Sequence, residues 1–204
     1  MRAALHAAAR LFSNLLSPPA VSAALGFAVA WKQHGFWPGA LRGLVFGALV
    51  SLAPLILVVY LYKTGRISDL HMSRSLSQRH LPYLAAFLSA LAAFLVFAAW
   101  EGLRRPGLPA LTGLAACSTV CLGLLGVINR AWLISNHTAS IMLAALYTVF
   151  LYGAPAAWLI LPLVALVIWS RWLLDKHTPL QMAAGLLVGA APVIILAGLG
   201  WLTP

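Results

Sequence analysis

The stretch PYLAAFLSALAAFLVFAAW, residues 82–100, decides the fold of this chain. It runs for 19 residues without a charged side chain, and a helix needs about 20 apolar residues to cross the hydrocarbon core of a bilayer. Similar runs recur along the chain, which is 63% hydrophobic and only 8% charged. A soluble domain of 204 residues could not bury so much apolar surface. The sequence therefore predicts an all-α integral membrane protein.

Apolar runs bounded by charged residues, proline or glycine predict a polytopic transmembrane helical bundle of six to seven spans. The spans cover roughly residues 18–32, 40–62, 82–101, 108–128, 139–153, 155–173 and 178–202. Before them, residues 1–19 carry Arg2, His6 and Arg10 between apolar residues. This pattern predicts an N-terminal amphipathic helix at the membrane interface, which we expect to be retained rather than cleaved. The whole chain, 1–204, is expected to form a single domain.

Basic residues greatly outnumber acidic ones in this chain. It has 13 Lys and Arg against three acids, Asp69, Glu101 and Asp175, and a formal net charge of +10. The cations are scattered between apolar spans and form no continuous stripe, which argues against a nucleic-acid partner. Loops that follow the positive-inside rule and a site that holds an anion would both account for the excess.

Three polar segments are predicted to lie on one face of the membrane. They cover residues 63–80, 129–138 and 171–177, and two spans separate each from the next. Four of the six histidines and two of the three acids fall in them. Ionisable groups at membrane depth are costly and persist mainly where they line a cavity or bind a ligand. We therefore expect the three segments to form a shared pocket.

The third segment and the residues around it read Ser170-Arg171-Trp-Leu-Leu-Asp-Lys-His177-Thr-Pro-Leu-Gln181. Arg171 ends one predicted helix and His177 opens the next, so a tight turn can bring their side chains together. Gln181 follows His177 by four positions and shares its helical face. The Gln181 carbonyl is expected to accept from one imidazole nitrogen and leave the other free to act as a nucleophile.

The second segment contains Ile134-Ser135-Asn136-His137-Thr138 and leads into a predicted helix. Ser135 or Asn136 is a candidate N-cap, and the backbone N–H groups at a helix N-terminus bind anions. His137 would then stand beside a phosphate-sized site.

These two segments, with Arg79 in the first, resemble the type 2 phosphatidic acid phosphatase superfamily of membrane lipid phosphatases. That family carries the motifs Lys-x6-Arg-Pro, Pro-Ser-Gly-His and Ser-Arg-x5-His-x3-Asp. The third motif is matched from Ser170 to His177, with Gln181 in place of the final aspartate. The resemblance covers roughly residues 63–185.

The other two motifs are matched in part. The second keeps Ser135 and His137, with Asn136 where the family has glycine. The first keeps Arg79, and Met72 stands at the lysine position. The order of the motifs and their predicted placement on one face agree with the family pattern.

The resemblance implies a two-step phosphoryl transfer that needs neither a metal nor another cofactor. His177 would attack phosphorus and form a phosphohistidine. His137 would protonate the leaving oxygen and then activate water. The residues expected to hold the phosphate oxygens are Arg74, Arg79, Ser135, Asn136 and Arg171, and Arg74 or His71 would supply the charge of the missing lysine.

The expected function is hydrolysis of a lipid phosphomonoester or diphosphate in a bacterial inner membrane. A polyprenyl phosphate or diphosphate is the first candidate substrate, and phosphatidic acid or phosphatidylglycerol phosphate comes next. The alternative is a non-catalytic protein of the same fold that binds or transports a lipid phosphate. A metal site built from the four histidines is a further interpretation, although no pair shows the helical spacing of a zinc site.

Orientation and the opposite face complete the expectations. Basic residues favour a cytoplasmic site, whereas the family resemblance favours an extracytoplasmic one, so orientation stays open, as does the oligomeric state. On the opposite face, Glu101 is expected to pair with Arg104 or Arg105, and Lys32 to contact lipid headgroups.

Overall fold

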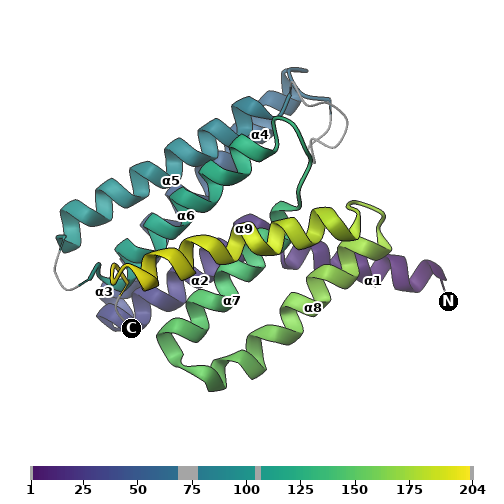
Figure 1. The fold of residues 1–204 in the computed structure, drawn as a ribbon. Helices are drawn as coiled ribbons and strands as arrows, with labels where there is room; N and C mark the ends of the chain where they lie inside the picture. The colour runs from purple at the N-terminus through teal and green to yellow at the C-terminus, as the bar shows by residue number, and fades with distance from the viewer. Residues whose placement is uncertain (1, 69–77, 104–106, 203–204) are drawn as a thin grey trace.

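A computed structural model describes residues 2–68, 78–103 and 107–202 of the chain (Figure 1). These residues form helices and connecting turns and contain no strand. In chain order the helices are α1 (Arg2–Leu15), α2 (Pro18–His34), α3 (Phe36–Gly47), the π-helical turn η1 (Ala48–Leu52), α4 (Ala53–Lys63), α5 (His80–Glu101), α6 (Ala110–Ile128), α7 (Asn136–Tyr152), the 3-10 turn η2 (Ala154–Ala156), α8 (Ala157–Leu173) and α9 (Pro179–Gly198).

The helices confirm the predicted all-α polytopic bundle. Five described stretches are long and apolar enough to cross a membrane: Phe36–Lys63, His80–Glu101, Ala110–Ile128, Ala154–Leu173 and Pro179–Gly198. A sixth is present if α1 and α2, which meet at a bend of 47°, form one broken span. The described part therefore has five to six such stretches by length and composition, against the six to seven expected.

The difference in number comes from α2 and α7, which correspond to the predicted spans 18–32 and 139–153. Each has 17 residues, which is about 25 Å at a rise of about 1.5 Å per residue. Helix α7 lies inside the bundle, packed against α2, α6, α8 and α9. In Figure 1, α5 and α6 run together on one side of the bundle and α7, α8 and α9 on the other. Because protein surrounds α7, its length need not match the bilayer.

Helix α1 is the predicted amphipathic helix, but one of its faces packs on protein. Ala9 and Ser13, four positions apart, are its buried residues, and α1 packs against α8. Phe12 meets Trp169 edge to face, with the ring centroids 6.5 Å apart. The N-terminal helix is therefore part of the bundle wall.

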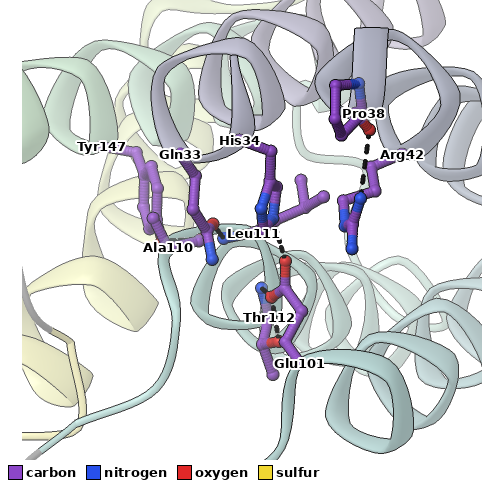
Figure 2. Close-up of polar contacts among 9 residues, drawn as sticks. All are labelled: Gln33, His34, Pro38, Arg42, Glu101, Ala110, Leu111, Thr112 and Tyr147. Atoms are coloured by element: carbon purple, nitrogen blue, oxygen red, sulfur yellow. Dashed lines mark hydrogen bonds and ion pairs between the residues drawn. The ribbon is translucent and has the colours of Figure 1, made fainter.

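A polar network joins helix ends at the face opposite the predicted site (Figure 2). The Glu101 carboxylate lies 2.7 Å from Nε2 of His34 and accepts from the Thr112 hydroxyl at 2.6 Å. The expected partners Arg104 and Arg105 lie outside the described residues, and the partners that are seen come from α2 and α6. The network thus ties together the ends of α2, α5 and α6.

Lys32 also differs from expectation. Its ammonium group donates to the carbonyl of Leu151 and lies 4.6 Å from the ring centroid of Tyr152. It therefore contacts the C-terminal end of α7, where a positive charge is favourable, rather than serving only as a headgroup contact.

Candidate functional site

Two glycines of α9 allow its N-terminal half to approach α7 closely. A Cβ placed on Gly185 would collide with Oγ1 of Thr138 and the carbonyl oxygen of Ser135. A Cβ on Gly189 would collide with the carbonyl oxygen of Ala139. Glycines four apart at a helix interface are a known device for close packing in membranes. They position the start of α7 against the start of α9.

Hydrogen bonds hold the two helix starts in register. The backbone N–H of Ser135 donates to the carbonyl of Gln181 at 3.2 Å. The Thr138 hydroxyl donates to the carbonyl of Met182 at 3.0 Å. The second and third predicted motifs are therefore physically joined, although 30 or more residues separate them in the chain.

The turn that leads into α7 is ordered by a buried asparagine. Asn129 donates through Nδ2 to the carbonyl of Leu125 at 2.9 Å and accepts through Oδ1 from the N–H of Ile134 at 3.1 Å. Ser135 then caps the helix, because its hydroxyl accepts from the N–H of Thr138 at 3.4 Å. Of the two candidate N-caps, Ser135 is confirmed.

The turn between α8 and α9 is as tight as the sequence predicted. Asp175 takes a left-handed conformation with φ of 50°, which Asp tolerates better than most residues. Thr178 caps α9 in a capping box, in which Oε1 of Gln181 accepts from the Thr178 N–H at 2.9 Å. Gln181 thus bonds to backbone, and its side chain also acts on the His177 imidazole through the expected hydrogen bond, which raises the pKa of His177. The Thr-x-x-Gln pattern was the sequence signal for this role.

A cavity of about 420 Å³ has its polar end between these two turns. The polar side chains that line this end are Ser13, Asn14, Asn136, His137, Ser140, Arg171 and His177. Arg171 is almost fully buried and donates through Nη1 to the Ser13 hydroxyl at 3.0 Å. Nε of Arg171 and Nδ1 of His177 are buried without a hydrogen-bond partner among the residues that the structure describes.

The charges around His177 act on its imidazole. Burial first, and then the positive charge of Arg171, lower the pKa of His177 from 6.5 to about 4. Arg79 and Lys176 act in the same direction, and the amide of Gln181 opposes them. His177 is therefore neutral at pH 7 and keeps a lone pair available. Its coupling to Arg79 also places the buried Arg79, at the start of α5, close to the site.

Some of the predicted site residues line the cavity and others do not. Asn136, His137, Arg171 and His177 line the cavity. Ser135 is fully buried and Gln181 is bound to Thr178, and neither is among the described lining residues. Arg74 lies outside the described residues.

Ser13 and Asn14 of α1 and Tyr83 of α5 line the same cavity and were not predicted. Small polar residues in an amphipathic helix usually face water, so nothing in the local pattern marks Ser13 as a partner of Arg171. Its spacing of four from Ala9 was the available signal, because both lie on one helical face.

No family model, curated protein or solved structure matches this chain. The likeness to the type 2 phosphatidic acid phosphatase superfamily therefore rests on the motif residues and their order. Among the described residues, no three His, Cys, Asp or Glu side chains are grouped as a metal site would require.

Proposed function

We propose that this protein is a membrane lipid phosphatase that hydrolyses the phosphomonoester or diphosphate of a lipid. The observation that carries the proposal is the gathering of His137, Arg171 and His177 at the polar end of one largely apolar cavity. A lipid phosphate has the matching form, with an anionic head and an apolar chain. The neutral imidazole beside buried cations supports a nucleophile rather than an acid at His177.

In the first chemical step, a ring nitrogen of His177 attacks phosphorus. A P–N bond forms while the P–O bond to the lipid breaks, and the leaving oxygen takes a proton from His137. In the second step His137 removes a proton from water, whose oxygen attacks phosphorus. The P–N bond then breaks and its electron pair returns to His177. The products are the dephosphorylated lipid, or its monophosphate if a diphosphate is the substrate, and inorganic phosphate.

Positive charge favours both binding and reaction. Arg171 and Arg79 lower the pKa of His177, and the same charges would attract a phosphate and stabilise the charge that develops on its oxygens. Helix α7 begins at Asn136, on the cavity wall. The positive end of a helix dipole favours an anion, although the N–H of Thr138 is already bound to the Ser135 hydroxyl.

The favoured substrate is a polyprenyl phosphate or diphosphate, followed by phosphatidic acid or phosphatidylglycerol phosphate. The apolar lining of the cavity supports a lipid over a soluble phosphate ester. The proposed location is a bacterial inner membrane.

One observation favours a second candidate, a non-catalytic protein that binds or transports a lipid phosphate. Gln181 stands where the family has aspartate, and its carbonyl is bound to the Thr178 backbone. It therefore gives an imidazolium at His177 no carboxylate for stabilisation.

The deciding experiment measures phosphate release by purified protein from farnesyl phosphate, farnesyl diphosphate and phosphatidic acid. We expect turnover that His177→Ala lowers by about 10³-fold or more, together with an acid-labile phosphoprotein that this variant does not form. His80→Ala is the matched control, because His80 is exposed at the start of α5 and is not among the described lining residues.

Other results would point elsewhere. Lipid binding without phosphate release by the wild-type protein would support the transport or binding candidate. Turnover that persists in His177→Ala would remove the assigned nucleophile, and turnover abolished by EDTA would favour a metal-dependent reaction.

A further inference from the structure

The cavity continues from its polar end into the interior of the bundle. Along α6 its lining runs from Leu125 to Leu114, which is about 16 Å of helix at a rise of about 1.5 Å per residue. This is about half of the roughly 30 Å hydrocarbon core of a bilayer. Leu114 lies only four positions from Ala110, where α6 begins at the opposite face, so the apolar arm reaches well past the middle of this helix.

Phe46 closes the deep end of this arm. It is fully buried and, among the lining residues of the stretch Phe36–Lys63, lies farthest from Lys63 at the site end. The Phe46 ring packs directly on Gly26, where a Cβ would collide with it. Its centroid lies 6.2 Å from the ring centroid of Phe97. Phe46 is held between two helices and cannot move aside easily.

The arm has an opening toward lipid at α4. Leu55 lines the cavity and is also 45% exposed. Helix α2 packs on α3, α7, η1 and α6, whereas α4 packs mainly on α5 and η1. Both α2 and α4 contribute lining residues to the cavity. Leu55 therefore marks a side on which the cavity lining is exposed to the surface of the bundle.

A buried hydroxyl in the arm also indicates a ligand. Ser51 lines the cavity, is 6% exposed, and its Oγ has no hydrogen-bond partner among the described residues. It lies in η1, and π-helical turns occur often at functional sites. A saturated chain has no hydrogen-bond acceptor for the Ser51 hydroxyl, whereas the double bond of a prenyl chain is a weak acceptor.

We infer that the arm binds one hydrocarbon chain of a single-chain lipid phosphate, with Phe46 setting how much of the chain is enclosed. The identity of the headgroup rests on the proposed function; the chain site does not. At about 420 Å³ the cavity is near the lower end of the roughly 300–1,000 Å³ of ligand sites. It accommodates one chain, so a two-chain lipid must leave its second chain in the bilayer.

The test is photolabelling with dodecyl phosphate that carries a diazirine near its methyl end, on purified protein in lipid nanodiscs. We expect labels on Phe46, Leu114 and their neighbours, with equal yield in His80→Ala, because His80 is exposed at the start of α5 and is not among the described lining residues. Labels confined to lipid-facing residues such as Leu187 and Ile194, which are 73% and 62% exposed, would overturn the inference. A protein that labels at Phe46 but releases no phosphate would retain the chain site and lose the proposed function.

Competition and one pair of variants complete the test. Unlabelled dodecyl or farnesyl phosphate is expected to displace the probe at least about tenfold better than dioleoyl phosphatidic acid, and farnesyl phosphate better than dodecyl phosphate. Phe46→Ala should shift binding toward longer chains by about tenfold. Leu111→Ala is the control, because Leu111 is equally buried but is not among the described lining residues. Equal shifts in both variants, or equal competition by the two-chain lipid, would contradict a closed single-chain arm.

Discussion

The two ends of this bundle treat buried polar groups differently. At one end, the Glu101 carboxylate has a partner on each oxygen, His34 and Thr112. At the other, Arg171 and His177 each keep a buried nitrogen without a partner among the described residues. A buried polar group normally has a hydrogen-bond partner because leaving it without one is costly. The Glu101 network thus holds helices together, although Nε of Arg42 near it is also buried without a partner among the described residues, and the site end is suited to a ligand that supplies the missing partner.

Removing the charge at the site end should give the largest effect. Arg171→Met keeps the apolar stem but removes the guanidinium, which we expect to lower phosphate release by about 10²- to 10³-fold. Thermal stability should stay unchanged or rise, because a buried nitrogen without a partner is removed with the charge. Initial rates and tryptophan-fluorescence melts check the two parts. A large loss of stability with normal activity would reverse the assignment of this end.

At the opposite end, removing the Glu101 carboxylate should lower stability and leave activity unchanged. Glu101→Leu leaves His34 and Thr112 without their partner, so we expect a loss of about 3 kcal/mol in the free energy of unfolding. The activity per folded molecule should be unaffected, since Glu101 lies at the C-terminal end of α5 and the site lies near its N-terminal end. Denaturation in detergent with parallel activity measurements tests this. Glu101→Gln, which keeps the hydrogen-bonding shape, should lose less; an equal loss would show that charge alone matters.

The close packing between the second and third site motifs can be disturbed by adding one methyl group. Gly185→Ala places a Cβ against Thr138 and the backbone of Ser135, and we expect it to cost about 1–3 kcal/mol and to lower activity. Gly198→Ala on the same helix is the matched control, because a Cβ there meets nothing within 4 Å. Melting curves and rates of both variants give the measurement. Similar behaviour of the two would mean that close packing at Gly185 does not position the site.

The smallest expected effect is a shift along the pH axis. His177 must be neutral to attack, and its pKa is lowered to about 4, so kcat/KM should hold from neutral pH down to about that value and then fall. Gln181→Glu adds a carboxylate beside the imidazole and should raise this acid limb by about one pH unit. The pH profiles of the two proteins are the measurement. An acid limb that does not move would place the titrating group elsewhere.

The same shift affects stability, with a defined sign. The lowered pKa of His177 means that the unfolded chain takes up this proton first as pH falls. Its contribution therefore makes the fold less stable as pH drops from 6.5 toward 4. Below about pH 4 this contribution of His177 to the stability of the fold is lost completely.

Much of the fold was predictable from local patterns, and part of the site was as well. The apolar run of α5 and the tight turn before His177 follow from residues close together in the chain. The hydrogen-bond partners of Ser135 and Gln181 do not follow from nearby residues, because a hydroxyl or an amide can bind either a ligand or the backbone. The contact of Ser13 with the site could not be predicted from local patterns, since its partner Arg171 lies 158 positions away in the chain.

The sequence by itself determined that this is a helical membrane protein and that its polar segments share a face. The lengths of apolar runs set the spans, and the number of spans between two loops sets their side. Only the tertiary structure decided which polar atoms meet the cavity. It gave Ser135 and Gln181 backbone partners, brought α1 against Arg171, and left Nδ1 of His177 buried without a hydrogen-bond partner among the described residues. Such choices depend on hydrogen-bond partners and packing surfaces that do not exist until the helices come together.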